Sequence, residues 1–300
     1  MAPLFSHPAG MPVLKSLRLI FQKKPVYLLK QPFFVFVCGG QLGSEQKTLR
    51  QQFIKWAESQ LPNFVCLLAE DALKDGFVPG RRKFINLGKF ESVIADIADC
   101  VLIFPESPGS FAETGFFSNS RKIRDKTLVI NPIDQQSDSF LNLGPIHTIN
   151  QFSFLQPTVL VASAQADFTQ LKQRLIDRVR VTHRDHLEYR EFKKLSPKEK
   201  LSVVLEILRL LRLADFNTLE HAISVCFDGN PQRQQLSDHL RILQAARLVH
   251  KSPETPYFRA MAGTNLIEIE NVDLDEILAS VTLFYQKYSP GLLDALREAS

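Results

Sequence analysis

The first half of the chain alternates short apolar runs with longer segments whose apolar residues recur at helical spacing. Four apolar runs predict buried parallel strands, at residues 32–40, 64–71, 100–106 and 127–132. Three segments between them have helical spacing, at residues 46–61, 89–100 and 110–123. This alternation predicts a parallel sheet covered by helices, a Rossmann- or flavodoxin-like α/β domain.

From about residue 166 the pattern becomes mainly helical. Ser196 and Glu199 precede a long apolar-periodic run, as at a capped helix start. Two further helical segments and a hairpin follow, the form of a winged helix-turn-helix. We therefore expect an N-terminal extension at 1–30, the α/β domain at 31–165, a basic helical linker at 166–195 and a winged-helix domain at 196–300.

The charge of the chain is uneven. The net charge is +4, but residues 172–200 hold ten Lys or Arg against five Asp or Glu, a local excess of five positive charges. Such an excess favours a polyanionic partner such as nucleic acid, or else it marks a solvated helix face.

The cysteines, the histidines and the apolar runs indicate the cellular compartment of the protein and whether it binds a metal. The four cysteines lie far apart in apolar surroundings, and neither they nor the seven histidines have metal-ligand spacing. They indicate small core residues in a reduced cytosol and no metal site. Lysines and arginines interrupt the apolar runs near the N-terminus, so we expect no signal peptide, no membrane span and a cytoplasmic protein.

The stretch FPESPGSFAETG, residues 104–115, joins a predicted strand to a predicted helix. Ser110 and Glu113 match the capping box S-x-x-E, in which the glutamate reaches back to the backbone amide of the serine. The stretch also follows the carboxyl end of a central strand, where α/β sheets bind ligands. A helix cap and an active site are both open, and one helix start can serve both.

The same stretch has features suited to chemistry. Pro108 and Gly109 predict a tight turn that leaves room for a substrate, and amides at a helix start favour phosphate or sugar oxygens. We expect the helix dipole to keep Glu113 ionised. A fixed, ionised carboxylate can attack an anomeric carbon, as in retaining glycoside cleavage, here with a base as the leaving group.

The segments FVFVCGG, IADCVLIFPESPGSFAETG, LVINP and SFLNLGP occur in this order. In them the chain resembles the nucleoside deoxyribosyltransferase-like effectors encoded beside type II retron reverse transcriptases, which join such a domain to a C-terminal winged helix. The resemblance covers most of the chain, and E-S-P-G-S-F-x-E-x-G after a strand is its most specific part. It implies a toxic effector of anti-phage defence by abortive infection, held inactive by the reverse transcriptase and msDNA in a higher-order complex.

The resemblance also implies roles for single residues. Glu113 would be the nucleophile of an N-glycosidase, and the neighbouring loop would cradle the sugar or phosphate. The loop residues are Ser107, Pro108, Gly109 and Ser110, and the adjoining floor is Cys38, Gly39 and Gly40. Asp71 and Glu91 are either second carboxylates that hold ribose hydroxyls or a base, or caps of their own helices.

One departure affects the expected substrate. Free-standing deoxyribosyltransferases carry an acidic residue shortly before the nucleophile, where this chain has Ser107. This difference favours cleavage of a larger nucleotide such as NAD over base exchange, with NAD as a substrate and no cofactor. The substrate stays open among NAD, nucleosides and nucleotides, and the alternative function is a nucleotide-sensing winged-helix regulator without catalysis.

The predicted helical segment at 230–249 has a buried leucine stripe and a polar end. In a DNA-binding winged helix this end enters the major groove, and the wing contacts phosphate. The candidate contacts are Arg233, Gln234, Ser237 and Arg241 on the helix and Lys251 and Arg259 on the wing. A winged helix used only for protein contact is the alternative.

Overall fold

The computed structural model describes residues 3–41, 43, 48–74, 86–178, 184–251 and 254–293. They form two compact units. The sheet unit takes the described residues within 31–74 and 86–178, and the helical unit takes 3–30 and the described residues from 184 to 293.

The sheet unit is built on five parallel strands in the order β3-β2-β4-β5-β6. They are β2 (Phe33–Cys38), β3 (Phe64–Leu67), β4 (Cys100–Ile103), β5 (Thr127–Pro132) and β6 (Val159–Val161). Numbered along the chain, this order is 2-1-3-4-5, that of flavodoxin-like sheets. The α/β fold predicted from the sequence is confirmed.

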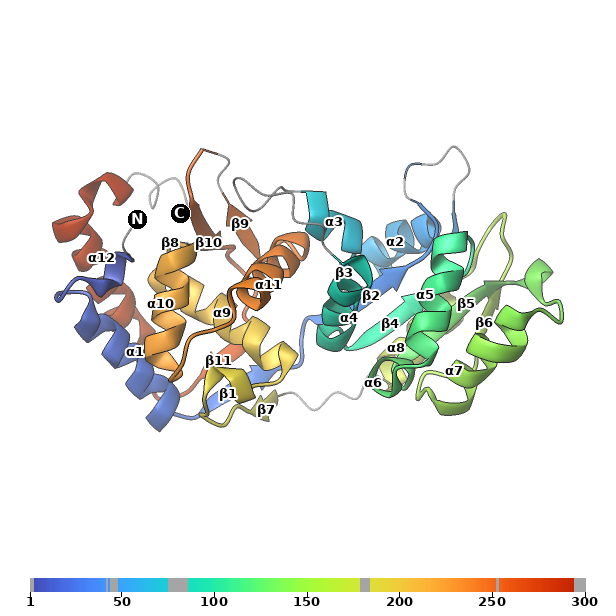
Figure 1. Cartoon of the computed structure of the whole chain (residues 1–300), viewed down its shortest axis with the longest axis horizontal. Coiled ribbons are helices and arrows are strands. Elements are labelled where there is room, and N and C mark those ends of the chain that lie inside the picture. The colour runs from blue at the N-terminus through green and yellow to red at the C-terminus, as the bar shows by residue number, and fades with distance from the viewer. Residues whose placement is uncertain are drawn as a thin grey trace. The chain divides into compact units, whose positions relative to one another are not determined.

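Helices cover both faces of this sheet (Figure 1). They are α2 (Leu49–Gln60), α3 (Ala69–Lys74), α4 (Leu87–Ile97), α5 (Pro108–Ser118), α6 (Arg121–Arg124), α7 (His147–Phe152) and α8 (Thr169–Arg178), with a short 3-10 helix η2 (Ile133–Gln135) and a π-helix η3 (Asn142–Ile146). Side chains alternate along a strand, so Val35 and Val37 pack with α2 and α8. On the opposite face Phe36 meets Phe117 of α5.

The segment 166–195, expected as a linker, is divided between the two units. Phe168, Leu171 and Leu175 are at most 1% exposed and pack in the sheet core, because α8 has an apolar stripe at helical spacing. Its basic residues Arg174 and Arg178 donate to backbone carbonyls of residues 154–157.

The N-terminal residues, expected as an extension, are part of the helical unit. Helix α1 (Met11–Lys23) buries Phe21 against Phe227, with the ring centroids 4.8 Å apart. Strand β1 (Val26–Leu29) pairs antiparallel with β11 (Ile267–Ile269) and β7 (Arg184–His186). This antiparallel sheet joins segments that are more than 200 residues apart.

The rest of the helical unit follows the order helix, short strand, two helices and hairpin. These are α9 (Pro197–Leu211), β8 (Ala214–Asp215), α10 (Phe216–Cys226), α11 (Arg233–Ala245), β9 (Val249–Lys251) and β10 (Tyr257–Ala260), with α12 (Leu274–Tyr288) and the turns η1 (Leu4–Ser6), η4 (Phe192–Lys194) and η5 (Pro290–Leu292). Strands β8, β10 and β9 form an antiparallel sheet in that order. The predicted Ser196–Glu199 capping box at α9 is confirmed.

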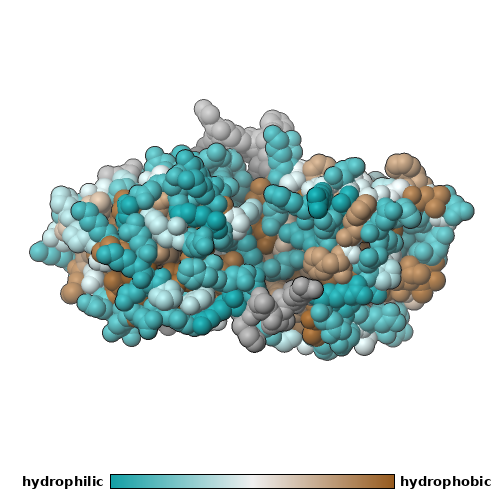
Figure 2. All heavy atoms as spheres, turned by 90° about the horizontal axis from the view of Figure 1, so that it is seen from below, coloured by the Kyte–Doolittle hydropathy of each residue, from teal (hydrophilic) through white to brown (hydrophobic). Residues whose placement is uncertain are grey.

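The surface is mainly hydrophilic in the view of Figure 2, and larger hydrophobic areas lie on the sheet unit. The most exposed large apolar side chains of that unit are Phe140, Leu143 and Ile133. Among the described residues, no helix combines the length and apolar character that a membrane span needs.

Candidate active site

The candidate site lies where the strand order of the sheet reverses. Strands β2 and β4 are neighbours, and the chain leaves them in opposite directions along the sheet. Flavodoxin-like folds bind ligands in the crevice beyond the carboxyl ends of such strands. Here those ends carry Cys38, Gly39 and Gly40 after β2, and the loop 104–107 after β4.

Helix α5 begins three residues earlier than the capping box Ser110–Glu113 predicts. Its N-cap is Ser107, whose Oγ accepts from the Ser110 amide at 3.2 Å. The Ser110 Oγ in turn accepts from the Ser107 amide at 2.9 Å. Pro108 fits the first helical position, where its missing N–H costs nothing. The predicted Ser110–Glu113 box is therefore wrong, and Glu113 lies in the second turn without a capping role.

Glu113 lacks a hydrogen-bond partner on one of its oxygens. Its Oε2 is buried and accepts no hydrogen bond from the part of the chain that the structure describes. Burial raises the pKa of Glu113, the positive charge of Arg50 lowers it in part, and Glu70 adds to the rise. The helix dipole was expected to keep Glu113 ionised, but Glu113 lies beyond the first turn of α5, and burial is the largest influence on its pKa. A carboxylate oxygen without a hydrogen-bond donor is a more reactive nucleophile than one that accepts a hydrogen bond in a helix cap.

Glu91 joins Glu113 in one electrostatic cluster. It lies on α4, is 7% exposed, and has its pKa raised to about 7 by burial, then by Glu113 and Glu70, with Arg50 opposing. Burial and the charges of Glu113 and Glu91 likewise raise the pKa of the Cys38 thiol. Three of the predicted residues, Glu113, Glu91 and Cys38, are therefore brought together from α5, α4 and β2.

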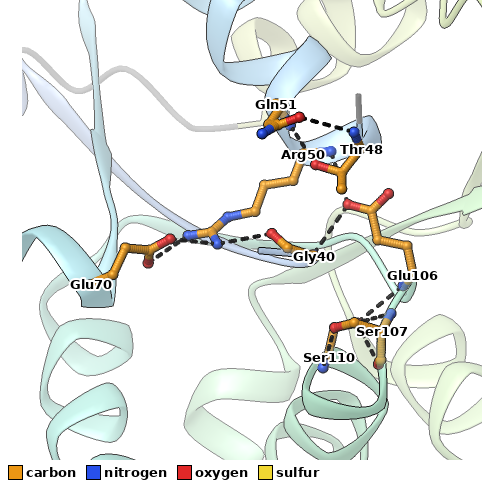
Figure 3. A network of polar contacts seen from close by, with 8 residues as sticks. All are labelled: Gly40, Thr48, Arg50, Gln51, Glu70, Glu106, Ser107 and Ser110. Atoms are coloured by element: carbon orange, nitrogen blue, oxygen red, sulfur yellow. Dashed lines mark hydrogen bonds and ion pairs between the residues drawn. The ribbon is translucent and has the colours of Figure 1, made fainter. Parts of the chain in front are cut away.

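Arg50 is the cation of this cluster, and the sequence analysis missed it. It is 5% exposed, and its guanidinium donates to the Glu70 carboxylate at 2.8 Å and to the Gly40 carbonyl at 3.3 Å. Figure 3 shows its side chain passing Gly40 toward Glu70. The predicted Asp71 is half-buried in α3, and its neighbour Glu70 is the acid that contacts Arg50. Arg50 lies two residues after Thr48, the N-cap of α2, and nothing in the sequence around it indicates that its side chain is buried.

Glu106 holds the turn after β2 to the start of α2 (Figure 3). Its carboxylate accepts from the amides of Leu49 at 2.7 Å, Arg50 at 3.1 Å and Gly40 at 3.2 Å. The glycine pair has a packing reason as well. A Cβ at Gly39 would lie 3.0 Å from Arg50, and one at Gly40 would lie 2.9 Å from Thr48. The predicted floor is therefore a packed corner.

The predicted cradle is only partly open. The hydroxyls of Ser107 and Ser110 are used in the cap, and Ser110 is 1% exposed. Pro108 and Gly109 are exposed, and a Cβ at Gly109 would meet only the Ser107 hydroxyl, 3.9 Å away. This turn is where a substrate could approach the backbone. No group of three His, Cys, Asp or Glu side chains suited to a metal occurs among the described residues.

Comparison with known proteins gives the family. The sequence model of the STM3845 retron effector protein matches residues 46–251, more than half of the chain. The chain belongs to this retron effector family. Its residues outside 46–251 are not part of the match.

Two curated relatives of the effector come from Escherichia coli. The "Retron Ec86 putative ribosyltransferase/DNA-binding protein" is 32% identical over 123 residues, which cover 40% of the effector and 38% of the relative. The "Retron Ec73 putative ribosyltransferase/DNA-binding protein" is 33% identical over 122 residues, which cover 40% and 39%. The match thus spans about two-fifths of each relative's length.

Part of the basic segment of the effector forms ion pairs within the chain. Ion pairs join Arg184 to Glu268 and Glu270, Arg190 to Glu199, and Lys193 and Lys194 to Glu191. Arg174 and Arg178 donate to backbone carbonyls, which are neutral and leave the charge of both side chains in place. Glu268 and Glu270 lie outside the segment and offset the charge of Arg184, whereas Glu191 and Glu199 are already counted in its charge excess.

The candidate contacts on α11 are also engaged with neighbours. Arg233 pairs with Glu220, Gln234 donates to Asp238 at 2.9 Å, and Arg241 lies 4.0 Å from the same carboxylate. A phosphate or base contact by these side chains would compete with these pairs.

The remaining candidates differ in exposure. Ser237 is 6% exposed, whereas Lys251 and Arg259 are half-buried on the hairpin strands β9 and β10. Lys251 lies with its Nζ 5.8 Å from the ring centroid of Phe258.

The raised pKa of Glu91 predicts a pH-dependent stability. Because its pKa rises from 4.5 to about 7 in the folded protein, the folded state binds more protons than the unfolded state between these values. Stability should therefore fall as pH rises from about 4.5 to about 7, by at most about 3 kcal/mol from this group. Glu91→Gln should remove that part, so that the variant gains on the native protein in denaturant unfolding at pH 8 but not at pH 4.

Asp96→Asn is the matched control, since Asp96 is exposed on the same helix. If the free energies of unfolding of Glu91→Gln and the native effector change with pH in parallel, this result would contradict a buried Glu91 carboxylate with a raised pKa.

Proposed function

We propose that the effector is an N-glycosidase that cleaves the bond between the sugar and the base of a nucleoside or nucleotide, with Glu113 as nucleophile. The observation that carries this proposal is the buried, unpartnered Oε2 of Glu113 on α5, the helix that follows the carboxyl end of β4, where α/β sheets bind ligands. The name ribosyltransferase of the two relatives supports a reaction at C1′ of a ribose. The fold then corresponds to a nucleoside deoxyribosyltransferase-like domain.

In the proposed reaction, the ionised carboxylate attacks C1′ and the bond to the base nitrogen breaks. The electron pair of that bond goes to the departing base, which takes up a proton. Water then hydrolyses the glycosyl ester, releasing the sugar and the free carboxylate. Arg50 favours the ionised form of Glu113 that this attack requires. Glu91 is proposed to hold a ribose hydroxyl or the base.

The helical unit is proposed to be a winged helix that binds the retron's nucleic acid or protein partners. The element order α9, β8, α10, α11, β9 and β10 supports this assignment, with β9 and β10 as the wing. The relatives' name DNA-binding is consistent with it. In the full proposal, the reverse transcriptase and msDNA hold the effector inactive until phage infection releases its toxicity.

Glu113→Gln tests the catalytic proposal. Gln keeps the size of the side chain and replaces a carboxylate whose pKa burial raises, so the fold and melting temperature should be retained. Release of free base from nucleosides, nucleotides and NAD by the purified chain should fall about a thousandfold or more. Glu58→Gln, an exposed site on α2, is the control and should leave turnover unchanged.

Retained turnover in Glu113→Gln would reject Glu113 as the nucleophile. Binding of a nucleotide without any product, in the native chain as well as the variant, would favour a sensing regulator without catalysis.

A salt titration tests the nucleic-acid contacts of the wing. If Lys251 and Arg259 bind phosphates, changing both to Gln should weaken binding to the retron's msDNA. The slope of log K against log salt should become shallower by about 0.7 to 0.9 for each phosphate that the variant no longer neutralises. Arg184→Gln is the control, because Arg184 is already paired with Glu268 and Glu270. An unchanged slope in the double variant would mean that Lys251 and Arg259 do not contact phosphate, and an unchanged slope after Arg233 and Arg241 are changed as well would mean that this unit docks on protein.

A further inference from the structure

The corner between β2 and α2 binds an anion that the chain itself supplies. Three backbone amides from two segments point at one carboxylate, that of Glu106, at 2.7 to 3.2 Å. Two of them, Leu49 and Arg50, are the first residues of α2, and the third, Gly40, ends the turn after β2. Glu106 comes from the neighbouring strand connection, directly before the N-cap of α5.

This is the position at which related folds bind phosphate. The first amides of a helix have no partner within the helix and carry partial positive charge, so they attract anions. In flavodoxin-like sheets, the turn after the first strand brings such a helix start to the ligand. The guanidinium of Arg50, which is paired with Glu70, also lies beside Gly40. Here the Glu106 carboxylate takes the place of a ligand anion.

Among the described residues, Glu106 and Thr48 pack closely around Gly40 in this corner. A Cβ at Gly40 would lie 3.2 Å from both Cγ and Oε1 of Glu106, and 2.9 Å from Thr48. A phosphate could reach the same amides only if the Glu106 side chain left. It would also meet a fixed negative charge on approach.

We infer that Glu106 is a specificity-determining residue, which fills the anion position at the start of α2 and excludes a substrate phosphate from it. The part of a substrate that enters this corner is then uncharged, so the effector selects nucleosides over nucleoside 5′-monophosphates there. The selectivity rests on the proposed glycosidase function, whereas the exclusion of phosphate can be measured without any turnover.

Inorganic phosphate is the probe for the exclusion. The full chain and its variants Glu106→Ala and Glu106→Ser are melted in 50 mM phosphate and in sodium chloride of equal ionic strength. Both variants should melt below the native chain in chloride, because three amides lose their acceptor. Phosphate should raise their melting temperatures by about 3 °C or more over chloride. The native chain and the control Glu58→Ala should melt alike in the two salts.

Three results would overturn the inference. A phosphate-specific rise in the native chain would mean that the anion displaces Glu106. Folded variants without such a rise would mean that the amides do not form an anion site once emptied. If the variants do not fold in chloride, they are refolded from urea in either salt. Failure to refold in both salts contradicts the inference, whereas refolding in phosphate alone supports it.

Turnover of a nucleoside and its 5′-monophosphate tests the selectivity. Glu106→Ser should shift the ratio of the two kcat/KM values at least tenfold toward the monophosphate. An unchanged ratio in a variant that binds inorganic phosphate would show that the substrate's phosphate does not reach this corner, which rejects the specificity role. Absence of turnover in the native chain would instead count against the proposed function and leave the phosphate result standing.

Discussion

The site depends on one constraint, which is that the amides at the start of α2 need an acceptor and Glu106 supplies it. The hydrogen bonds from Gly40, Leu49 and Arg50 tie the turn after β2 to the loop after β4. Because Arg50 is itself one of the donors, the same contact fixes the start of the side chain that reaches Glu70. Charge-assisted bonds of this kind are stronger than neutral ones, so this corner is a rigid base for the site.

The acidic cluster follows from this arrangement. Glu113, Glu91 and Glu70 share one buried cation, Arg50, and burial raises the pKa values of Glu113 and Glu91. The single positive charge of Arg50 compensates only part of the free energy that burying these carboxylates costs. A substrate that removes or neutralises one of the negative charges therefore lowers the electrostatic energy of the cluster. In the proposed reaction, bond formation at Glu113 removes one of these negative charges. Ser107 and Ser110 cap the start of α5, so Glu113 is not needed as a cap and its carboxylate is available for the proposed reaction.

The sequence predicted what depends on local pattern and missed what depends on tertiary contact. Strand runs such as 32–40 predicted the sheet and hence the place of Glu113, and the S-x-x-E spacing at Ser196 predicted a real cap. The same spacing at Ser110 misled, because Pro108 sets an earlier helix start. Arg50, Glu70 and Glu106 carry no local signal, since each gains its role from another segment. The pairing of β1 with β11 could not be predicted from local pattern either, because the two strands are more than 200 residues apart in the sequence.

The most direct test of this account is to trap the glycosyl-enzyme ester on Glu113. Incubation of the purified chain with a 2′-fluoro-2′-deoxyarabinosyl nucleoside, whose fluorine slows hydrolysis of the ester, is followed by intact-mass and peptide mass spectrometry. The account predicts that the mass of one fluorinated sugar is added to the peptide that contains Glu113, and that this addition is absent in Glu113→Gln. Stoichiometric labelling of a different carboxylate, or base release from the parent nucleoside without any trapped ester, would contradict it.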